Sequence, residues 1–290
     1  MRGQPVKHNM DPMSRLADFL RNLVGRGPRD AAPRRSPNGA SSFHLIWESL
    51  TGPVPESRLV EVSAVLEVVE PPGVEALYYW ALQVDLADGR GVWGSGHTGL
   101  QWNRRYPGGR AVNWGGYRSS EEGGQVLAGT PSSLPGFPDD PNTLSYAWEA
   151  GRPYRLRVYR SPEVAGAWRA EVTDLWSGAA TVVRDLLPDS GRGVSGAHLT
   201  RPIVWSEVFA DCEAPSVTVR WSDFMAVDEG GSVFRPEAVR ANYQSPQEGG
   251  CSNTTVLADE SGGLLQVTNV PRLVEQGAHV PLSGSAGSAQ

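Results

Sequence analysis

Residues 77–84, LYYWALQV, place apolar or aromatic side chains on both faces that an extended chain would present. A run of this kind, only eight residues long, is typical of a central strand that is covered on both sides. In residues 60–68, by contrast, apolar positions alternate with Glu61, Ser63 and Glu67, which predicts a strand with one buried face. Residues 217–221 alternate in the same way. The period around this stretch is therefore two residues, the period of β-structure.

Working outward, the same short-period pattern recurs along most of the chain. Connectors rich in Gly, Pro, Asp and Asn separate about a dozen such segments, and no long helical pattern interrupts them. This organisation predicts an all-β fold, an antiparallel sandwich of the jelly-roll type. The further predicted strands are 43–48, 92–102, 154–160, 168–174, 181–186, 203–209, 238–243, 254–258 and 264–269.

One hairpin has a register that the sequence specifies. If residues 161–167 form the connector, opposed residue numbers sum to 328, so Leu156 lies opposite Val172 and Arg157 opposite Glu171. The apolar pair then faces one side of the sheet and the charged pair the other. This register makes Glu171 a structural residue and not a catalytic one.

The chain is predicted to hold one folded domain, residues 42–272, between two tails. Residues 1–41 combine a linker with a short amphipathic helix that begins at Ser14 and carries apolar side chains at 16, 19, 20, 23 and 24. Such a basic helix docks on its own domain, on a protein partner or on a membrane surface, and the sequence leaves these alternatives open. Residues 273–290 are polar and Gly/Ser-rich, which predicts a disordered tail.

Charge is distributed unevenly along the 290 residues, whose net charge is −6. Residues 1–35 hold eight basic and three acidic residues, whereas the remainder holds 18 basic and 29 acidic ones. An acidic folded part is a poor partner for nucleic acid. The sequence contains neither a run of about 20 apolar residues for a transmembrane helix nor a signal-peptide pattern, so a cytoplasmic location is expected unless export follows another route.

Cysteine and histidine usage limits the redox and metal chemistry. Cys212 and Cys251 are either one bridge in an oxidising compartment or two reduced thiols, and both readings stay open. The five histidines have no spacing typical of a metal pair, and no phosphate loop occurs. No metal or other cofactor is predicted.

The segments 93–102 and 113–117 concentrate tryptophan, glycine and polar residues. Glycines allow close approach of the backbone, and indole rings offer flat apolar surface, so these segments suit a stacking platform for sugar rings. The same residues also suit a tightly bent sandwich core. The candidate ligand-binding residues are Trp93, Gln101, Trp102, Arg104, Asn113, Trp114 and Tyr117.

A catalytic alternative centres on Glu207. This residue shares strand parity with Ile203 and Trp205, so its carboxylate is expected on an apolar, aromatic face, where desolvation favours general-acid chemistry. His97, or Tyr79, would assist it. A buried ion pair between Glu207 and an arginine is the structural alternative. Asp211 is about 13 Å away along a strand, beyond the carboxyl spacing of glycosidases.

Several of these segments together resemble an uncharacterised bacterial family of concanavalin-like domains. The resemblance covers residues 43–272 and implies two stacked, curved sheets and a connection to glycans. The family has no established catalytic residues that carry over to this chain. The resemblance rests on residues 77–84, 98–101, 151–158, 168–170, 206–209, 251–254 and 268–269.

We therefore predict a non-catalytic β-sandwich that binds a glycan or another small polar ligand. The alternatives are a glycosidase or polysaccharide lyase with Glu207 as acid/base, and an intracellular protein-interaction domain that works through its N-terminal helix. The aromatic content favours the glycan-binding sandwich over both alternatives, and the sequence offers no convincing catalytic pair.

Overall fold

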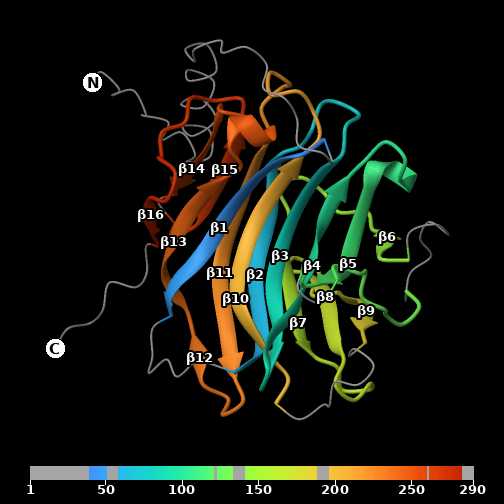
Figure 1. Ribbon diagram of the computed structural model, residues 1–290. Coiled ribbons are helices and arrows are strands. Elements are labelled where there is room, and N and C mark those ends of the chain that lie inside the picture. The colour runs from blue at the N-terminus through green and yellow to red at the C-terminus, as the bar shows by residue number, and fades with distance from the viewer. Residues whose placement is uncertain are drawn as a thin grey trace, which may run out of the picture.

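The computed structural model describes residues 39–50, 58–120, 123–132, 141–187, 196–259 and 261–282. Its strands form two antiparallel layers (Figure 1). Leu199 pairs with Leu59 between the layers, and at another edge residues 126–129 bridge them, through Val126 with Tyr117 and Gly129 with Leu186. The first sheet has the order β16 (His279–Pro281), β13 (Pro236–Tyr243), β1 (Ser41–Leu50), β10 (His198–Val208), β3 (Tyr78–Asp88), β4 (Gly91–Trp102), β5 (Arg110–Arg118) and β6 (Thr143–Ser145).

The second sheet packs against the first. Its order is β14 (Thr254–Ala258), β15 (Leu264–Thr268), β11 (Thr218–Asp228), β2 (Leu59–Glu70), β7 (Pro153–Arg160), β8 (Trp168–Asp174) and β9 (Ala180–Leu186), with the short β12 (Val233–Phe234) beside β11. Apart from two short 3-10 turns, Pro107–Gly109 and Pro246–Glu248, the elements named in the described ranges are strands. The predicted all-β antiparallel sandwich is confirmed.

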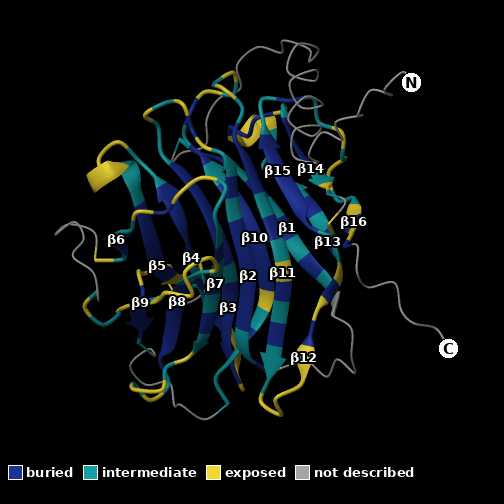
Figure 2. Cartoon of the chain, turned by 180° about the vertical axis from the view of Figure 1, so that it is seen from behind, coloured by how far each residue is buried: buried dark blue, intermediate teal, exposed yellow. Residues whose placement is uncertain are grey.

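The core lies between the two sheets. Val62, Ala64, Leu66 and Val68 of β2 are all buried, as the alternation in residues 60–68 predicts. Figure 2 shows the same contrast across the molecule, with buried strands in the middle and exposed residues in the connecting loops. The largest fully buried side chains include Trp80, Trp114, Trp148 and Trp221.

Strand β3 is buried on both faces, as its composition predicts. Trp80 and Leu82 point into the core between the sheets. Tyr79 and Ala81 lie on the opposite, outer face, where they form a second apolar cluster with Trp205. Ile203 of β10 belongs to the same cluster and Ile46 of β1 packs against it, so neighbouring strands contribute to this cover.

The predicted hairpin register is confirmed. Leu156 pairs with Val172 and Arg157 with Glu171. The Arg157 guanidinium lies 3.8 Å from the Glu171 carboxylate and 2.6 Å from that of Glu61 on β2. These three side chains form an ion-pair cluster on the outer face of the second sheet, so Glu171 is structural.

The C-terminal boundary differs from the expected one. The sequence placed the end of the domain at Arg272, but β16 pairs with β13, and Val280 and Leu282 are buried. Two apolar residues in a polar segment were enough to attach it to a sheet edge, a contact that composition does not reveal. The predicted N-terminal helix and residues 283–290 lie outside the described residues.

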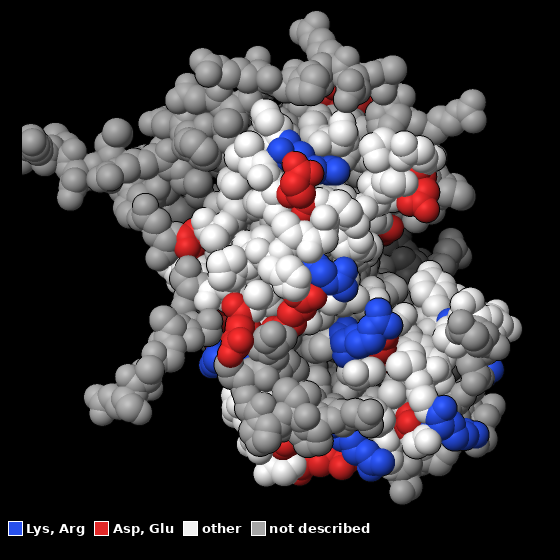
Figure 3. All heavy atoms as spheres, turned by 60° about the vertical axis from the view of Figure 1, so that its left-hand side comes forward, with Lys and Arg blue, Asp and Glu red and all other residues white. Residues whose placement is uncertain are grey.

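Cys212 and Cys251 form a disulfide with a Cα–Cα distance of 5.5 Å. It joins the loop between β10 and β11 to the segment before β14, which settles the alternative that the sequence left open. Charged groups of both signs lie next to one another on the surface shown in Figure 3, so that face carries no extended field of one sign. No helix in the described ranges has the length and apolarity to cross a membrane.

Candidate functional site

The outer face of the first sheet brings together most of the polar candidates. Strand register aligns Trp205, Ala81, Gly99 and Asn113 in one row across β10, β3, β4 and β5. The next row aligns Glu207, Tyr79 and Gln101. Side chains in register on one side of a pleated sheet share a face, so one surface collects aromatic, amide and carboxylate groups.

Five rings on this face form a continuous series, here called the aromatic cluster. His97 is its centre: its ring centroid lies 5.8 Å from those of Tyr79 and Trp205, both edge-on, and 6.1 Å from that of Tyr117, which is stacked. Trp205 lies 4.9 Å from Tyr79 and 6.0 Å from His44. These separations are those of favourable aromatic contacts. The series therefore crosses the sheet from β5 to β1.

Small residues in the centre of the face make this arrangement possible. Gly99 has no side chain, and a Cβ there would overlap the carbonyl oxygen of Trp80. Tyr79 lies beside it on β3, and its hydroxyl donates to Asn113 Oδ1 at 2.9 Å on β5. A larger residue at position 99 would force β4 away from β3.

The amide side chains are held by a hydrogen-bond network. Asn113 Nδ2 donates to Thr143 Oγ1 at 3.1 Å, and the Tyr106 hydroxyl donates to Gln101 Oε1 at 2.9 Å. The Trp205 indole donates to Gln83 Oε1 at 3.0 Å. Such bonds fix the orientation of the amides, and each amide retains further donor or acceptor capacity.

Burial makes both imidazoles of the cluster poor bases. The pKa of His97 is lowered to about 4 because its surroundings desolvate the charged form, and the pKa of His44 is lowered to about 4 for the same reason. Both rings are neutral at pH 7, so the aromatic cluster carries no positive charge there.

Glu207 lies on the same face but away from His97. Its neighbours in register are Ser42 and Tyr79, and the Ser42 hydroxyl donates to Glu207 Oε1 at 3.4 Å. His97 is two strands away and four positions further along, which places the two backbones about 16 Å apart. They do not form one catalytic constellation, whereas Tyr79 is adjacent to Glu207.

The other carboxylates on the strands of this face are also distant from Glu207. Asp85 on β3 is six positions from Tyr79, the partner of Glu207, and Glu48 on β1 is six positions from Ser42. Six residues span about 20 Å, whereas glycosidase carboxyls stand about 5–9.5 Å apart. These strand positions place neither carboxylate within glycosidase spacing of Glu207.

The predicted tryptophan platform is not formed. Trp93 and Trp114 are 4% and 0% exposed and lie in the core between the sheets. Trp102 is half-buried against that core, and its indole donates to the Val74 carbonyl at 2.9 Å. Arg104 is exposed and pairs with Glu75. Trp102 and Trp114 share the parity of Leu100 and Val112 in the paired strands, and that parity is the signal that marks them as core.

Three residues of the face were missed by sequence reasoning: His44, Gln83 and Trp205. Parity did place Trp205 beside Glu207, but a role for its ring was not inferred. His44 and Gln83 come together with Trp205 only through the pairing of β10 with β1 on one side and with β3 on the other. Non-adjacent strand order cannot be read from alternation alone.

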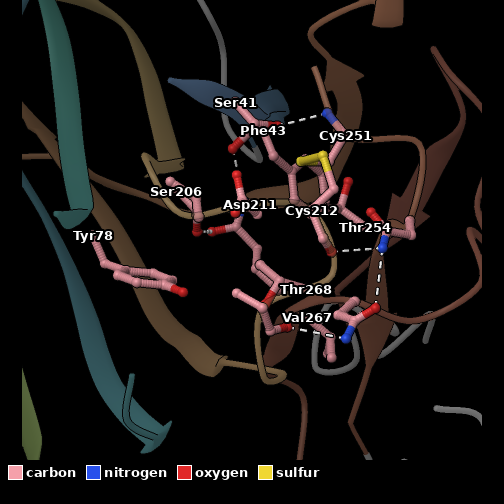
Figure 4. Close-up of a pocket in the computed structure, with 15 residues that line it drawn as sticks. Ser41, Phe43, Tyr78, Ser206, Asp211, Cys212, Cys251, Thr254, Val267 and Thr268 are labelled. Atoms are coloured by element: carbon pink, nitrogen blue, oxygen red, sulfur yellow. Dashed lines mark hydrogen bonds between the residues drawn. A yellow bond between two sulfur atoms is a disulfide. The ribbon is translucent and has the colours of Figure 1, made fainter. Parts of the chain in front are cut away.

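A second candidate is an internal cavity beside the disulfide (Figure 4). Tyr78 points into it from one side, and Cys212 and Cys251 lie on the other. Its volume is about 20 Å³, which matches a single water molecule and is far below the roughly 300–1,000 Å³ of small-molecule sites. This cavity is not a site for an organic ligand.

No family model matches the chain, and no curated protein matches it. Similar solved structures include Scytalido-glutamic peptidase with a peptide-based transition-state analogue and SCP-B, a member of the Eqolisin family of peptidases, in complex with the tripeptide Ala-Ile-His. Each is 13% identical, covers 80% of this chain and 97% of its own, and gives a TM-score of 0.38. At this identity and TM-score, the likeness assigns neither a family nor a residue role to this chain.

Proposed function

We propose that the outer face of the first sheet binds a carbohydrate without cleaving it. The observation that carries this proposal is the position of Tyr117, which is 50% exposed and stacks on His97 at the margin of the aromatic cluster. An exposed ring backed by a second, neutral ring is a rigid flat surface. Such a surface suits the apolar C–H face of a sugar.

The polar groups beside these rings suit the hydroxyls of the same ligand. Asn113 on β5, Gln101 on β4 and Glu207 on β10 all lie on this face. A ligand site typically combines apolar surface with a few oriented polar groups, and the hydrogen bonds of Asn113 and Gln101 supply that orientation. Of the seven predicted ligand-binding residues, the proposal retains Gln101, Asn113 and Tyr117, which lie on the outer face, and omits Trp93 and Trp114, which lie in the core between the sheets. Gln101 and Asn113 are 6% and 7% exposed, so only the ends of these amides can reach a ligand.

We favour binding over hydrolysis because the rings and amides of this face account for recognition of a sugar, whereas Asp85 and Glu48 lie about 20 Å from Glu207 along the strands. Neutral His97 is also too far from Glu207 to exchange a proton with a group bound there. The features that remain, rings and oriented amides, stabilise a bound sugar without supplying a reaction.

The test is a glycan array probed with the full chain, followed by titration of the best ligand against Tyr117→Ala. By analogy with ring stacking on nucleobases, worth roughly 1–3 kcal/mol, we expect binding to weaken about 5- to 150-fold. The melting temperature should change little because Tyr117 is half exposed.

Trp176→Ala is the matched control, because Trp176 is 66% exposed and lies in the turn between β8 and β9. It should bind like the parent. Absence of any glycan ligand for the parent, or equal affinity of Tyr117→Ala and the parent, would refute the proposal.

A further inference from the structure

An open cleft lies at one end of the sandwich and is here called the end cleft. It shares Asp211 and Ala214 with the lining of the cavity beside the disulfide. Its volume is about 460 Å³, within the range of sites that hold a ligand or a peptide segment. The loop between β2 and β3 forms one wall, and the loop between β10 and β11 forms the other. Its lining residues are Val74, Ala76, Phe209, Ala210, Asp211, Glu213 and Ala214.

The lining combines an apolar floor with an acidic rim. Val74, Ala76 and Ala214 are partly buried and pack against the main core, so they continue its apolar surface outward. Asp211 and Glu213 are exposed. An occupant that matches this lining is amphipathic, with apolar side chains for the floor and basic ones for the rim.

Several contacts hold the second wall in place. The Phe209 amide donates to the Leu77 carbonyl at 2.9 Å, and the Ala214 amide donates to the Asp211 carbonyl at 3.0 Å. Asn269 Nδ2 donates to the Ala214 carbonyl at 3.0 Å, and the disulfide anchors Cys212 in the same loop. The cleft is therefore preformed, which reduces the entropy that its occupant must lose on binding.

The described part of the chain begins beside this cleft. Gly39 lies against Phe209, since a Cβ built on Gly39 would stand 3.8 Å from Phe209 Cδ1. The next residue, Ala40, is fully buried. The N-terminal end of the described residues therefore lies beside the cleft wall.

Residues 14–24 have the composition that the cleft matches. Leu16, Phe19, Leu20, Leu23 and Val24 recur at helical spacing, and Arg15 and Arg21 accompany the single acidic residue, Asp18. Residues 25–38 reach up to about 45 Å when extended, so the segment can return to the cleft. Eleven residues are too few for a stable isolated helix in water, so this segment gains by packing against a surface.

We propose that residues 14–24 dock in the end cleft of their own chain, with the apolar face on the floor and Arg15 or Arg21 beside Asp211 and Glu213. A tether of this length holds the segment at millimolar effective concentration, which favours docking in cis over binding of a second copy. The proposal is independent of carbohydrate binding.

Limited trypsin digestion of the full chain tests this, with cleavage after Arg15 and Arg21 followed by mass spectrometry. In D211K/E213K these two cleavages should be about tenfold faster than in the parent, the factor that corresponds to about 1.4 kcal/mol of docking free energy. Cleavage after Lys7, outside the docked segment, should be unchanged and serves as the internal reference.

E237K/E275K is the matched control, because it reverses two exposed carboxylates outside the cleft and should leave the parent rates unchanged. Phe19→Asp should reproduce the fast cleavage with the folded domain untouched. Equal rates in the parent, D211K/E213K and Phe19→Asp would overturn the proposal. Protection that increases with protein concentration would also overturn it and would identify a second copy as the occupant.

Discussion

The Tyr117 ring stacks on the His97 imidazole across β5 and β4, with centroids 6.1 Å apart and an angle of 28° between the planes. The exposed end of the aromatic cluster therefore rests on a group that is neutral at pH 7 and titrates only in acid. Protonation of His97 would place a charge among Tyr79, Trp205 and Tyr117, and this links the candidate site to pH.

Stability should fall as the pH is lowered from about 6.5 to about 4. The folded-state pKa of His97 is about 4 and its unfolded value is 6.5, so the unfolded chain binds a proton first and unfolding becomes easier over that interval. We expect His97 to account for on the order of 1–3 kcal/mol of this loss, discounted for its partial exposure. Denaturant unfolding at pH 7 and pH 4.5 measures it, and a His97→Gln variant with the same pH slope as the parent would contradict it.

Substitution of the core tryptophans should cost stability rather than binding. Trp114→Ala removes a fully buried ring and the donor to the Trp168 carbonyl at 2.9 Å, so we expect a loss of about 3–5 kcal/mol in the free energy of unfolding. Trp102→Ala should cost less, because Trp102 is half-buried. Urea titration gives both values, with Trp176→Ala expected within about 0.5 kcal/mol of the parent. A Trp114→Ala variant as stable as the parent would show that this ring is not core.

Gly96 is required by the ring of Trp114. A Cβ at position 96 would lie 2.6 Å from Cη2 of that indole, so Gly96→Ala should cost about 1–3 kcal/mol through overpacking. Trp114→Phe opens that space, and the double variant should recover part of the loss from Gly96→Ala. A double-mutant cycle from urea unfolding measures the coupling, and strictly additive losses would disprove the steric explanation.

Loss of the disulfide should destabilise the fold. Cys212 and Cys251 are separated by 39 residues, and closing a loop of that length is worth about 4 kcal/mol by the chain-entropy account. C212S/C251S should therefore unfold at lower urea concentration, and dithiothreitol should lower the melting temperature of the parent but not of this variant. Mass spectrometry of the unreduced protein checks the bridge directly, and two free thiols in the purified protein would contradict it.

Alternation by itself was sufficient for the fold class and for much of the strand pattern. Residues 60–68 lie in β2 and residues 78–84 in β3, and the β7–β8 register matches pair by pair. Burial follows the prediction at most of these positions, but Val60 is half-buried and Ser63, predicted on the exposed face, is fully buried. These are local properties, because side-chain parity and a short connector decide them. The site was less predictable. Glu207, Gln101, Asn113 and Tyr117 do share a face, but Trp93 and Trp114 were assigned to a platform although they are core residues.

The sequence by itself determined which segments are extended and which of their faces is apolar, because the pleat imposes a period of two on every strand. Only the tertiary structure decided which strands are neighbours: β10 lies between β1 and β3, which brings His44, Trp205 and His97 together from three distant segments. It also decided the pairing of β16 with β13 and the closure of the Cys212–Cys251 bridge. These contacts join residues far apart in the chain, and many strand orders satisfy the same alternation, so the packing of the two sheets selects among them.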